Sequence, residues 1–142
     1  MAAYQIFVQP PTGYLWYIAV SPALRGNGLG TAYYQAIVEK VFQFTDVLLF
    51  EVEMPEHCTD AEMRRLAERR IVFYRRNGAA LLTGIHYLQS VGSHVPPTPM
   101  HLMIHARRPI QAREAYEIAR GIFGEAVSQV GPLTLSGFQQ NQ

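Results

Sequence analysis

The sequence predicts one α/β domain in which helices flank a mixed, largely antiparallel sheet. Short runs rich in β-branched and aromatic residues alternate with longer segments whose apolar residues recur at helical spacing. The 142 residues are 49% hydrophobic, which provides enough apolar material for one core. No internal repeat separates the chain into units, so we expect a single domain over residues 1–142.

Composition also narrows the function classes. A net charge of +1 and a pI near 7.9 give no electrostatic case for nucleic acid or membrane as the main partner. The single cysteine, Cys58, excludes an intrachain disulfide and fits a reducing compartment. The first residues lack the features of a signal peptide, and no apolar run approaches the ~20 residues that span a bilayer. We therefore expect a cytoplasmic protein that binds neither nucleic acid nor membrane.

The chain opens with an expected antiparallel hairpin. The first strand covers residues 4–8 and stops at Pro10 and Pro11, after which the turn at Gly13 reverses the chain. The second strand covers residues 15–20, because aromatic and β-branched side chains suit a pleated, half-buried surface.

A helix and a strand are expected next. Apolar residues recur at helical spacing over residues 29–41, and Lys40 is the one charge on that face. Residues 47–53 alternate between a wholly apolar face and a face that carries Glu51 and Glu53. This alternation predicts a strand with one face in the core.

The following helix is expected to begin and end at recognisable caps. Thr59 and Glu62 have the spacing of a capping box, and Gly78 after Asn77 can take the left-handed conformation that ends a helix. Several arginines populate the polar faces of this helix. We interpret them as a solvated surface paired with glutamates, with binding of a coenzyme phosphate or a partner as the alternative.

The last expected elements are two strands and a helix. The strands cover residues 81–88 and 100–106, and Pro109 opens a helix with an apolar side. Residues 130–142 are expected to form a loosely ordered tail.

The glycine-rich segment between the second strand and the first helix indicates an anion site. Free N–H groups at a helix start carry partial positive charge, and residues without Cβ let an anion approach the backbone. The segment lacks the lysine of a nucleoside-triphosphate loop. It also lacks the last glycine of a dinucleotide fingerprint, which the suitably spaced Glu51 cannot replace.

The remaining pattern, Arg25-x-x-Gly28-x-Gly30, resembles the coenzyme A pyrophosphate loop of the GNAT superfamily of acyl-CoA N-acyltransferases. Tyr74, near the end of the second helix, matches a tyrosine that the family commonly carries there. The resemblance covers residues 6–107. The family normally has a strand, two helices and another strand before this hairpin, so the sequence resembles an N-terminally short member with an added C-terminal helix.

The resemblance implies an N-acetyltransferase that uses acetyl-CoA as its acyl-donor substrate and needs no metal. A primary amine would attack the thioester directly. Tyr74 is then the expected acid for the departing thiolate, and Glu51 and Glu53 are the candidates for the base. The coenzyme-binding residues implied are Ile18, Ala19, Val20, Arg25, Gly26, Asn27, Gly28, Leu29, Gly30, Thr31 and Tyr74.

A second function class stays open beside the enzyme. A non-catalytic regulatory or assembly protein could keep the acetyltransferase fold, with or without coenzyme A binding. The short N-terminus and the absence of a carboxylate on the strand at residues 15–20 favour this alternative, whereas the intact loop and Tyr74 oppose it. An unpaired edge at the first hairpin also leads us to expect a homodimer.

Overall fold

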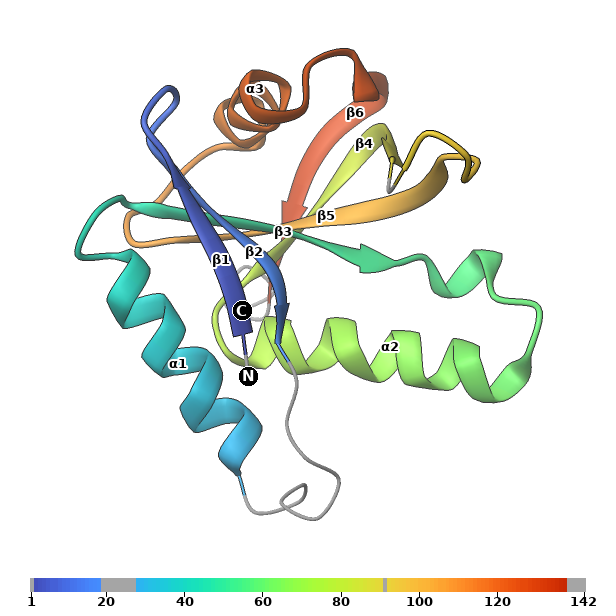
Figure 1. Ribbon diagram of the computed structural model, residues 1–142, viewed down its shortest axis with the longest axis horizontal. Helices are drawn as coiled ribbons and strands as arrows, with labels where there is room; N and C mark the ends of the chain where they lie inside the picture. The colour runs from blue at the N-terminus through green and yellow to red at the C-terminus, as the bar shows by residue number, and fades with distance from the viewer. Residues whose placement is uncertain (1, 19–27, 91, 138–142) are drawn as a thin grey trace.

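The computed structural model describes residues 2–18, 28–90 and 92–137 (Figure 1). Predictions that fall on residues 19–27, among them Ala19, Val20, Arg25, Gly26 and Asn27, lie outside the described residues. The strands are β1 (Ala2–Phe7), β2 (Thr12–Ile18), β3 (Val47–Glu53), β4 (Ala80–Gln89), β5 (Thr98–Ala106) and β6 (Val127–Ser136). The helices are α1 (Leu29–Val41), α2 (Ala61–Arg76) and α3 (Ala112–Phe123), with short 3-10 turns η2 (Pro55–His57) and η3 (Gly124–Ala126).

The strands form one six-stranded sheet in the order β1-β2-β3-β5-β4-β6. β2 and β3 are parallel, and the other neighbouring strands are antiparallel. The predicted mixed, largely antiparallel sheet with flanking helices is therefore confirmed.

The two faces of the sheet are covered by different helices. In Figure 1, α1 and α2 lie below the sheet and α3 lies above it. Phe50 of β3 packs with Tyr34 of α1 and Tyr74 of α2, whereas Leu49 belongs to the cluster that includes Ala115 and Ala119 of α3. Adjacent residues of a strand point to opposite faces, so both faces of β3 are buried here.

The start of α2 differs from the predicted capping box. The N-cap is Asp60, whose carboxylate accepts a hydrogen bond of 2.8 Å from the backbone N–H of Glu62. The prediction of a cap at Thr59 was wrong by one residue, because Asp satisfies a helix start as well as Thr does. The predicted end is confirmed: α2 stops at Arg76, and Gly78 has a φ of +107°.

The C-terminal region differs more. Residues 127–136 form β6, which pairs with β4, so residues 130–136 are an edge strand and not part of a loosely ordered tail. The pairing requires a glycine on β4. Gly84 has a φ of +89°, and a side chain there would collide with the backbone carbonyl of Pro132.

Candidate functional site

The site is organised around an opening between the parallel strands β2 and β3. These strands pair only at Gly13 with Leu48 and at Tyr14 with Leu49, within the described part of β2. Beyond these pairs the strands diverge, as Figure 1 shows. Backbone N–H and C=O groups along the diverging edges have no ladder partner and can bind an extended ligand.

The N-terminus of α1 provides a set of backbone donors beside this opening. Its N-cap, Gly28, has a φ of 73° and supplies no side-chain cap, and the first turn carries no acidic residue. The first helical hydrogen bond recorded runs from Ala32 N–H to the Gly28 carbonyl. The N–H groups of the preceding turn therefore point out of the helix, where an anion is favoured.

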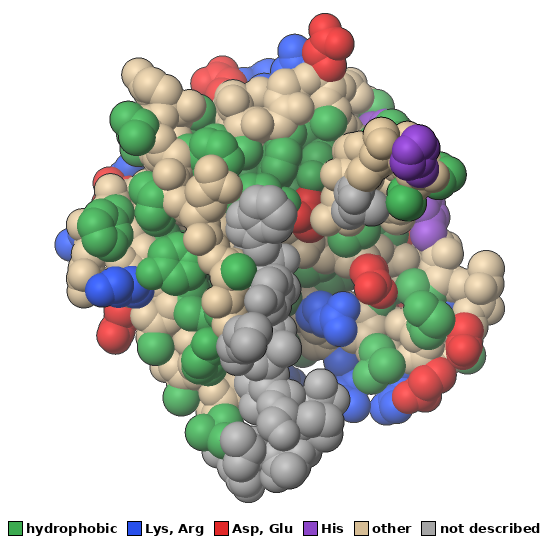
Figure 2. Space-filling model, in the orientation of Figure 1, with side chains coloured by type: hydrophobic (Ala, Val, Ile, Leu, Met, Phe, Trp, Pro, Cys, Tyr) green, Lys and Arg blue, Asp and Glu red, His purple; other side chains and the backbone are tan. Residues whose placement is uncertain are grey.

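An arginine-lined pocket joins this helix start to α2. Its volume is about 570 Å³. Its lining comprises Thr31 of α1 and, from α2 and the residue after it, Arg65, Glu68, Arg69, Val72, Phe73, Arg76 and Asn77. Arg65 is paired with Glu62 at 2.6 Å, whereas no acidic side chain among the described residues forms a salt bridge with Arg69 or Arg76. Figure 2 shows Lys and Arg side chains gathered over α2 on this face.

Tyr74 lies in the core on the same face of the sheet. Its ring is 4.5 Å from that of Phe50 and 5.4 Å from that of Tyr34, measured between centroids. Burial raises the pKa of Tyr74, and the positive charge of Arg70 opposes that rise. The hydroxyl therefore stays protonated near neutral pH, as a proton donor must.

Glu51 lies on the other face, at the point where β2 and β3 begin to diverge. Its carboxylate accepts hydrogen bonds from the hydroxyls of Tyr14 on β2 and Tyr87 on β4, the second at 2.6 Å. Burial is the largest cause that raises the pKa of both tyrosines, and the hydrogen bond and charge of Glu51 raise it further. Both hydroxyls therefore remain donors, and Glu51 remains their common acceptor.

Glu53 has different surroundings from Glu51. Its side chain is exposed at the end of β3, and it lies 3.8 Å from the guanidinium of Arg70. It also lines a pocket of about 360 Å³. The remaining lining residues are Met54, His57, Cys58, Thr59, Met63, Gln89, Thr98, Pro99 and Met100.

The structure therefore brings the predicted residues together only in part. Glu51 and Tyr74 lie on opposite faces of the sheet, because Phe50, the residue before Glu51 on β3, points to the face of Tyr74 and contacts it. Gly28, Leu29, Gly30 and Thr31 form the start of α1, where the sequence predicts them. For Ile18 the structure describes the backbone, as the last residue of β2.

Sequence reasoning missed the connection between Tyr14, Glu51 and Tyr87. The sequence singled out Glu51 by its place on the polar face of its strand. It gave no signal that links the three residues, since each comes from a different strand. Arg69 and Arg76 are exposed, which fits the solvated surface that the sequence favoured, and they also line a pocket beside α1.

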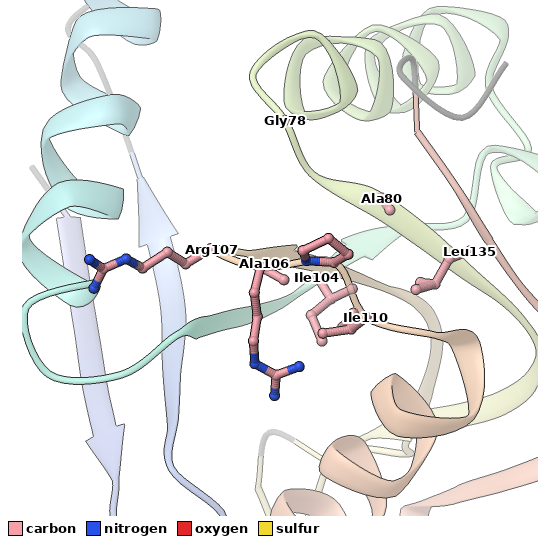
Figure 3. A pocket seen from close by; sticks show the side chains of 9 residues that line it. Gly78, Ala80, Ile104, Ala106, Arg107, Ile110 and Leu135 are labelled. Atoms are coloured by element: carbon pink, nitrogen blue, oxygen red, sulfur yellow. The ribbon is translucent and has the colours of Figure 1, made fainter. Parts of the chain in front are cut away.

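A third pocket lies at the far end of the sheet (Figure 3). Its volume is about 340 Å³, and its walls include Ile104, Ile110 and Leu135. Arg107 points away from these walls toward α1, where it donates a hydrogen bond of 3.2 Å to the Phe42 carbonyl. None of the predicted site residues lines this pocket.

The described residues contain neither a membrane-spanning helix nor a metal-binding group of side chains. No helix there is both long enough and apolar enough to cross a bilayer. In the same parts of the chain, no three or more His, Cys, Asp or Glu side chains are grouped so that they could hold a metal ion.

Comparisons with known proteins agree with this geometry. Residues 1–61 match the model of the acetyltransferase (GNAT) family. A solved structure from Bacteroides thetaiotaomicron, assigned by name to the GNAT family of acetyltransferases, is 27% identical with a TM-score of 0.64, over 87% of this chain and 65% of that one. The ribosomal-protein-S18-alanine N-acetyltransferase of Escherichia coli is 18% identical with a TM-score of 0.51, over 77% and 61%. An acetyltransferase of Bacillus subtilis, solved in complex with CoA, is 13% identical with a TM-score of 0.52, over 74% and 66%.

These matches confirm the predicted resemblance and the GNAT-type fold. The chain spans 61 to 66% of the lengths of the three solved proteins. No match was found among curated proteins.

Proposed function

We propose that this chain is an acyl-CoA-dependent N-acyltransferase that moves an acetyl group from acetyl-CoA to a primary amine. The observation that carries the proposal is the opening between β2 and β3, which has a helix N-terminus on one side and a half-buried carboxylate, Glu51, on the other. The GNAT-type fold and the family match at residues 1–61 support it.

The donor would bind on the face of the sheet covered by α1 and α2. Its pyrophosphate would accept hydrogen bonds from the first N–H groups of α1, which the side chains of that helix leave uncapped. Arg69 and Arg76 in the adjoining pocket carry the positive charge that a further phosphate of the coenzyme requires. The Bacillus subtilis protein of similar fold was solved with CoA, which is consistent with this role.

In the proposed reaction, the base Glu51 and the acid Tyr74 act from opposite faces of the sheet. Glu51 removes a proton from the ammonium form of the acceptor, and the neutral nitrogen attacks the thioester carbon. The carbon–sulfur bond breaks, and Tyr74 gives its hydroxyl proton to the departing thiolate. The second proton lost by the nitrogen, as the amide forms, returns to Tyr74 through solvent. Placing the base and the acid on opposite faces lets the acceptor enter from one side while the coenzyme occupies the other.

The charge of the arginine pocket gives a direct test. We expect acetyl-CoA to raise the Tm of the wild-type protein, and Arg69→Glu to reduce that rise severely, because it reverses a charge beside the phosphates. Arg113→Glu is the matched control, since Arg113 is an exposed arginine of α3. Coenzyme release in the presence of a panel of primary amines then measures turnover.

The outcomes separate the two function classes. Binding of acetyl-CoA with turnover of at least one amine supports the enzyme. Binding without turnover of any amine supports a non-catalytic protein that keeps the coenzyme site. Equal stabilisation of the wild type, Arg69→Glu and Arg113→Glu would remove the donor assignment.

A further inference from the structure

Glu51 is a half-buried carboxylate whose recorded partners are all neutral. Its two hydrogen bonds come from tyrosine hydroxyls, and no Arg, Lys or His among the described residues lies within salt-bridge distance of it. A carboxylate removed from water is costly unless it is paired with a cation. The negative charge of Glu51 is therefore available to a cationic ligand.

The hydrogen bonds of Glu51 also leave room for such a ligand. Tyr14 donates to Oε1 and Tyr87 donates to Oε2, so each oxygen has one tyrosine partner. A carboxylate oxygen can accept about two hydrogen bonds, which leaves about one site on each oxygen. The two tyrosines come from β2 and β4, on either side of β3 in the sheet order, so they fix the carboxylate from two directions.

Two further aromatic rings pack against the tyrosines that bind this carboxylate. Phe123, at the end of α3, packs edge-on against Tyr14 with ring centroids 5.3 Å apart, and its ring is tilted against that of Tyr87 at 4.7 Å. Phe7 stacks on Tyr14 at 6.4 Å. Aromatic faces attract organic cations and exclude water from them, so the rings and the charge favour the same kind of ligand.

We propose that Tyr14 and Tyr87 are positioning residues of Glu51, and that with Phe123 they form the site that receives the ammonium group of an acceptor carrying an aromatic or other apolar substituent. This inference rests on the proposed function and adds to it the chemical class of the acceptor. In the proton step, the ammonium loses one proton to a Glu51 oxygen and becomes the neutral amine. The tyrosine hydroxyls keep their own protons throughout.

Binding of a probe amine tests the site without any turnover. Isothermal titration of the wild-type protein with 2-phenylethylamine, in the absence of acetyl-CoA, should give saturable binding, and 2-phenylethanol should bind much more weakly because it lacks the charge. Glu51→Gln should weaken amine binding about tenfold to hundredfold, the effect of removing one charged hydrogen-bond partner. Glu117→Gln, an exposed carboxylate on α3, is the control and should bind as the wild type does.

The positioning role has its own test. Tyr14→Phe and Tyr87→Phe should each raise the KM for 2-phenylethylamine and leave the Tm rise with acetyl-CoA unchanged. Each should also lower kcat for this amine, because a hydroxyl that holds the Glu51 carboxylate in place is gone. Tyr116→Phe makes the same change on α3, away from Glu51, and should alter neither the KM nor kcat.

Each result decides the question. Equal binding of the amine by wild type and Glu51→Gln, or equal binding of 2-phenylethanol, overturns the ammonium site. A loss of stability in Tyr14→Phe and Tyr87→Phe without a change in KM or kcat overturns the positioning role and leaves the tyrosines as core residues. The donor experiment is independent, since failure of acetyl-CoA to bind while the amine still binds Glu51 would refute the proposed enzyme and not the ammonium site.

Discussion

Two buried tyrosines on the same face of the sheet differ in what their hydroxyls do. The Tyr34 hydroxyl forms a hydrogen bond of 2.8 Å with Nδ1 of His105. The Tyr74 hydroxyl, in contrast, has no recorded hydrogen bond within the described parts of the chain, while its ring contacts Phe50, Phe73 and Tyr34. The packing role of Tyr74 therefore belongs to its ring, and the hydroxyl is free for chemistry.

This separation predicts the effect of Tyr74→Phe. The change keeps the ring contacts and deletes only the proposed proton donor, so turnover should fall about 10²–10⁴-fold while acetyl-CoA affinity and Tm stay near their wild-type values. Steady-state kinetics under conditions where chemistry limits the rate make the measurement. Unchanged turnover would leave Tyr74 as a packing residue.

His105 predicts a pH dependence of stability. Burial lowers the pKa of His105 below its ordinary value, so below about pH 6.5 the unfolded chain takes up a proton that the folded protein resists. Above the pKa of His105 in the unfolded chain, His105 has no effect on the free energy of unfolding. As the pH falls below that pKa, His105 lowers the free energy of unfolding progressively, by at most about 1.4 kcal/mol per pH unit. Urea unfolding between about pH 7.5 and 5.5 should therefore show a steeper loss in wild type than in His105→Gln.

His94→Gln provides the control for this measurement, since His94 is an exposed loop residue. It should keep the wild-type slope of unfolding free energy against pH. The same slope in wild type and His105→Gln would show that His105 does not titrate differently on unfolding.

At the scale of elements, α1 matters through its N-terminus. A Cβ at Gly28 would meet no atom within 4 Å, so the demand for glycine comes from its φ of 73° and from the open space that a ligand would use. Gly28→Val should lower the apo Tm modestly, because a β-branched residue disfavours this backbone, and should largely abolish the Tm rise with acetyl-CoA.

Gly124→Val separates backbone strain from ligand binding. Gly124 also has a positive φ, of 61°, and open space around its Cβ position, but it lies at the end of α3 on the other face. Its replacement should lower the apo Tm and preserve the rise with acetyl-CoA. An equal rise in Gly28→Val and wild type would contradict the proposed role of the α1 N-terminus.

The elements predicted best are those with a strong local pattern. β3 covers residues 47–53 as its alternation predicts, because this pattern depends on β3 alone. The pattern predicted one face in the core, whereas Val47 and Leu49 bury part of the second face as well. β6 was not predicted, since Gly131 and Pro132 interrupt its pattern. Its pairing also depends on the positive φ of Gly84 on β4, a contact that no local pattern records.

Within the candidate site, too, the parts that depend on a local sequence pattern could be predicted and the contacts between distant strands could not. The start of α1, where we propose that the pyrophosphate binds, could be predicted because glycine spacing and the helix start are both local features. The link from Tyr14 through Glu51 to Tyr87 could not, because the strand order places β5 between β3 and β4 and the sequence does not specify that order. Side chains that meet across a sheet become neighbours only once its topology is known.

At the scale of the whole molecule, α3 covers the face of the sheet opposite α1 and α2. Ala115 and Ala119 are fully buried against it, and Phe123 reaches Tyr14 on β2. Because α3 covers this face, the case for a dimer rests on the sheet edges.

The two edges differ in their protection against pairing. Both edge strands have a shift in register against their neighbours, but β6 also carries Pro132, which discourages pairing with a further strand. β1 contains neither proline nor a charged residue, and its Gln5 side chain is exposed. A strand with a free edge and no charge is a template for another chain, so we predict a homodimer formed through β1.

Sedimentation equilibrium at micromolar concentration tests this prediction. The wild-type chain of 16.0 kDa should give about twice that mass, and Gln5→Lys should shift it toward monomer because the new charge would lie at the paired edge. Val130→Lys places the same charge on the exposed surface of β6, where Val130 is 69% exposed, and should leave the dimer intact. A mass near 16.0 kDa for the wild type would refute the dimer. If Gln5→Lys and Val130→Lys both gave a monomer, the effect of the charge would not be specific to β1. That result would contradict a dimer formed through β1 alone.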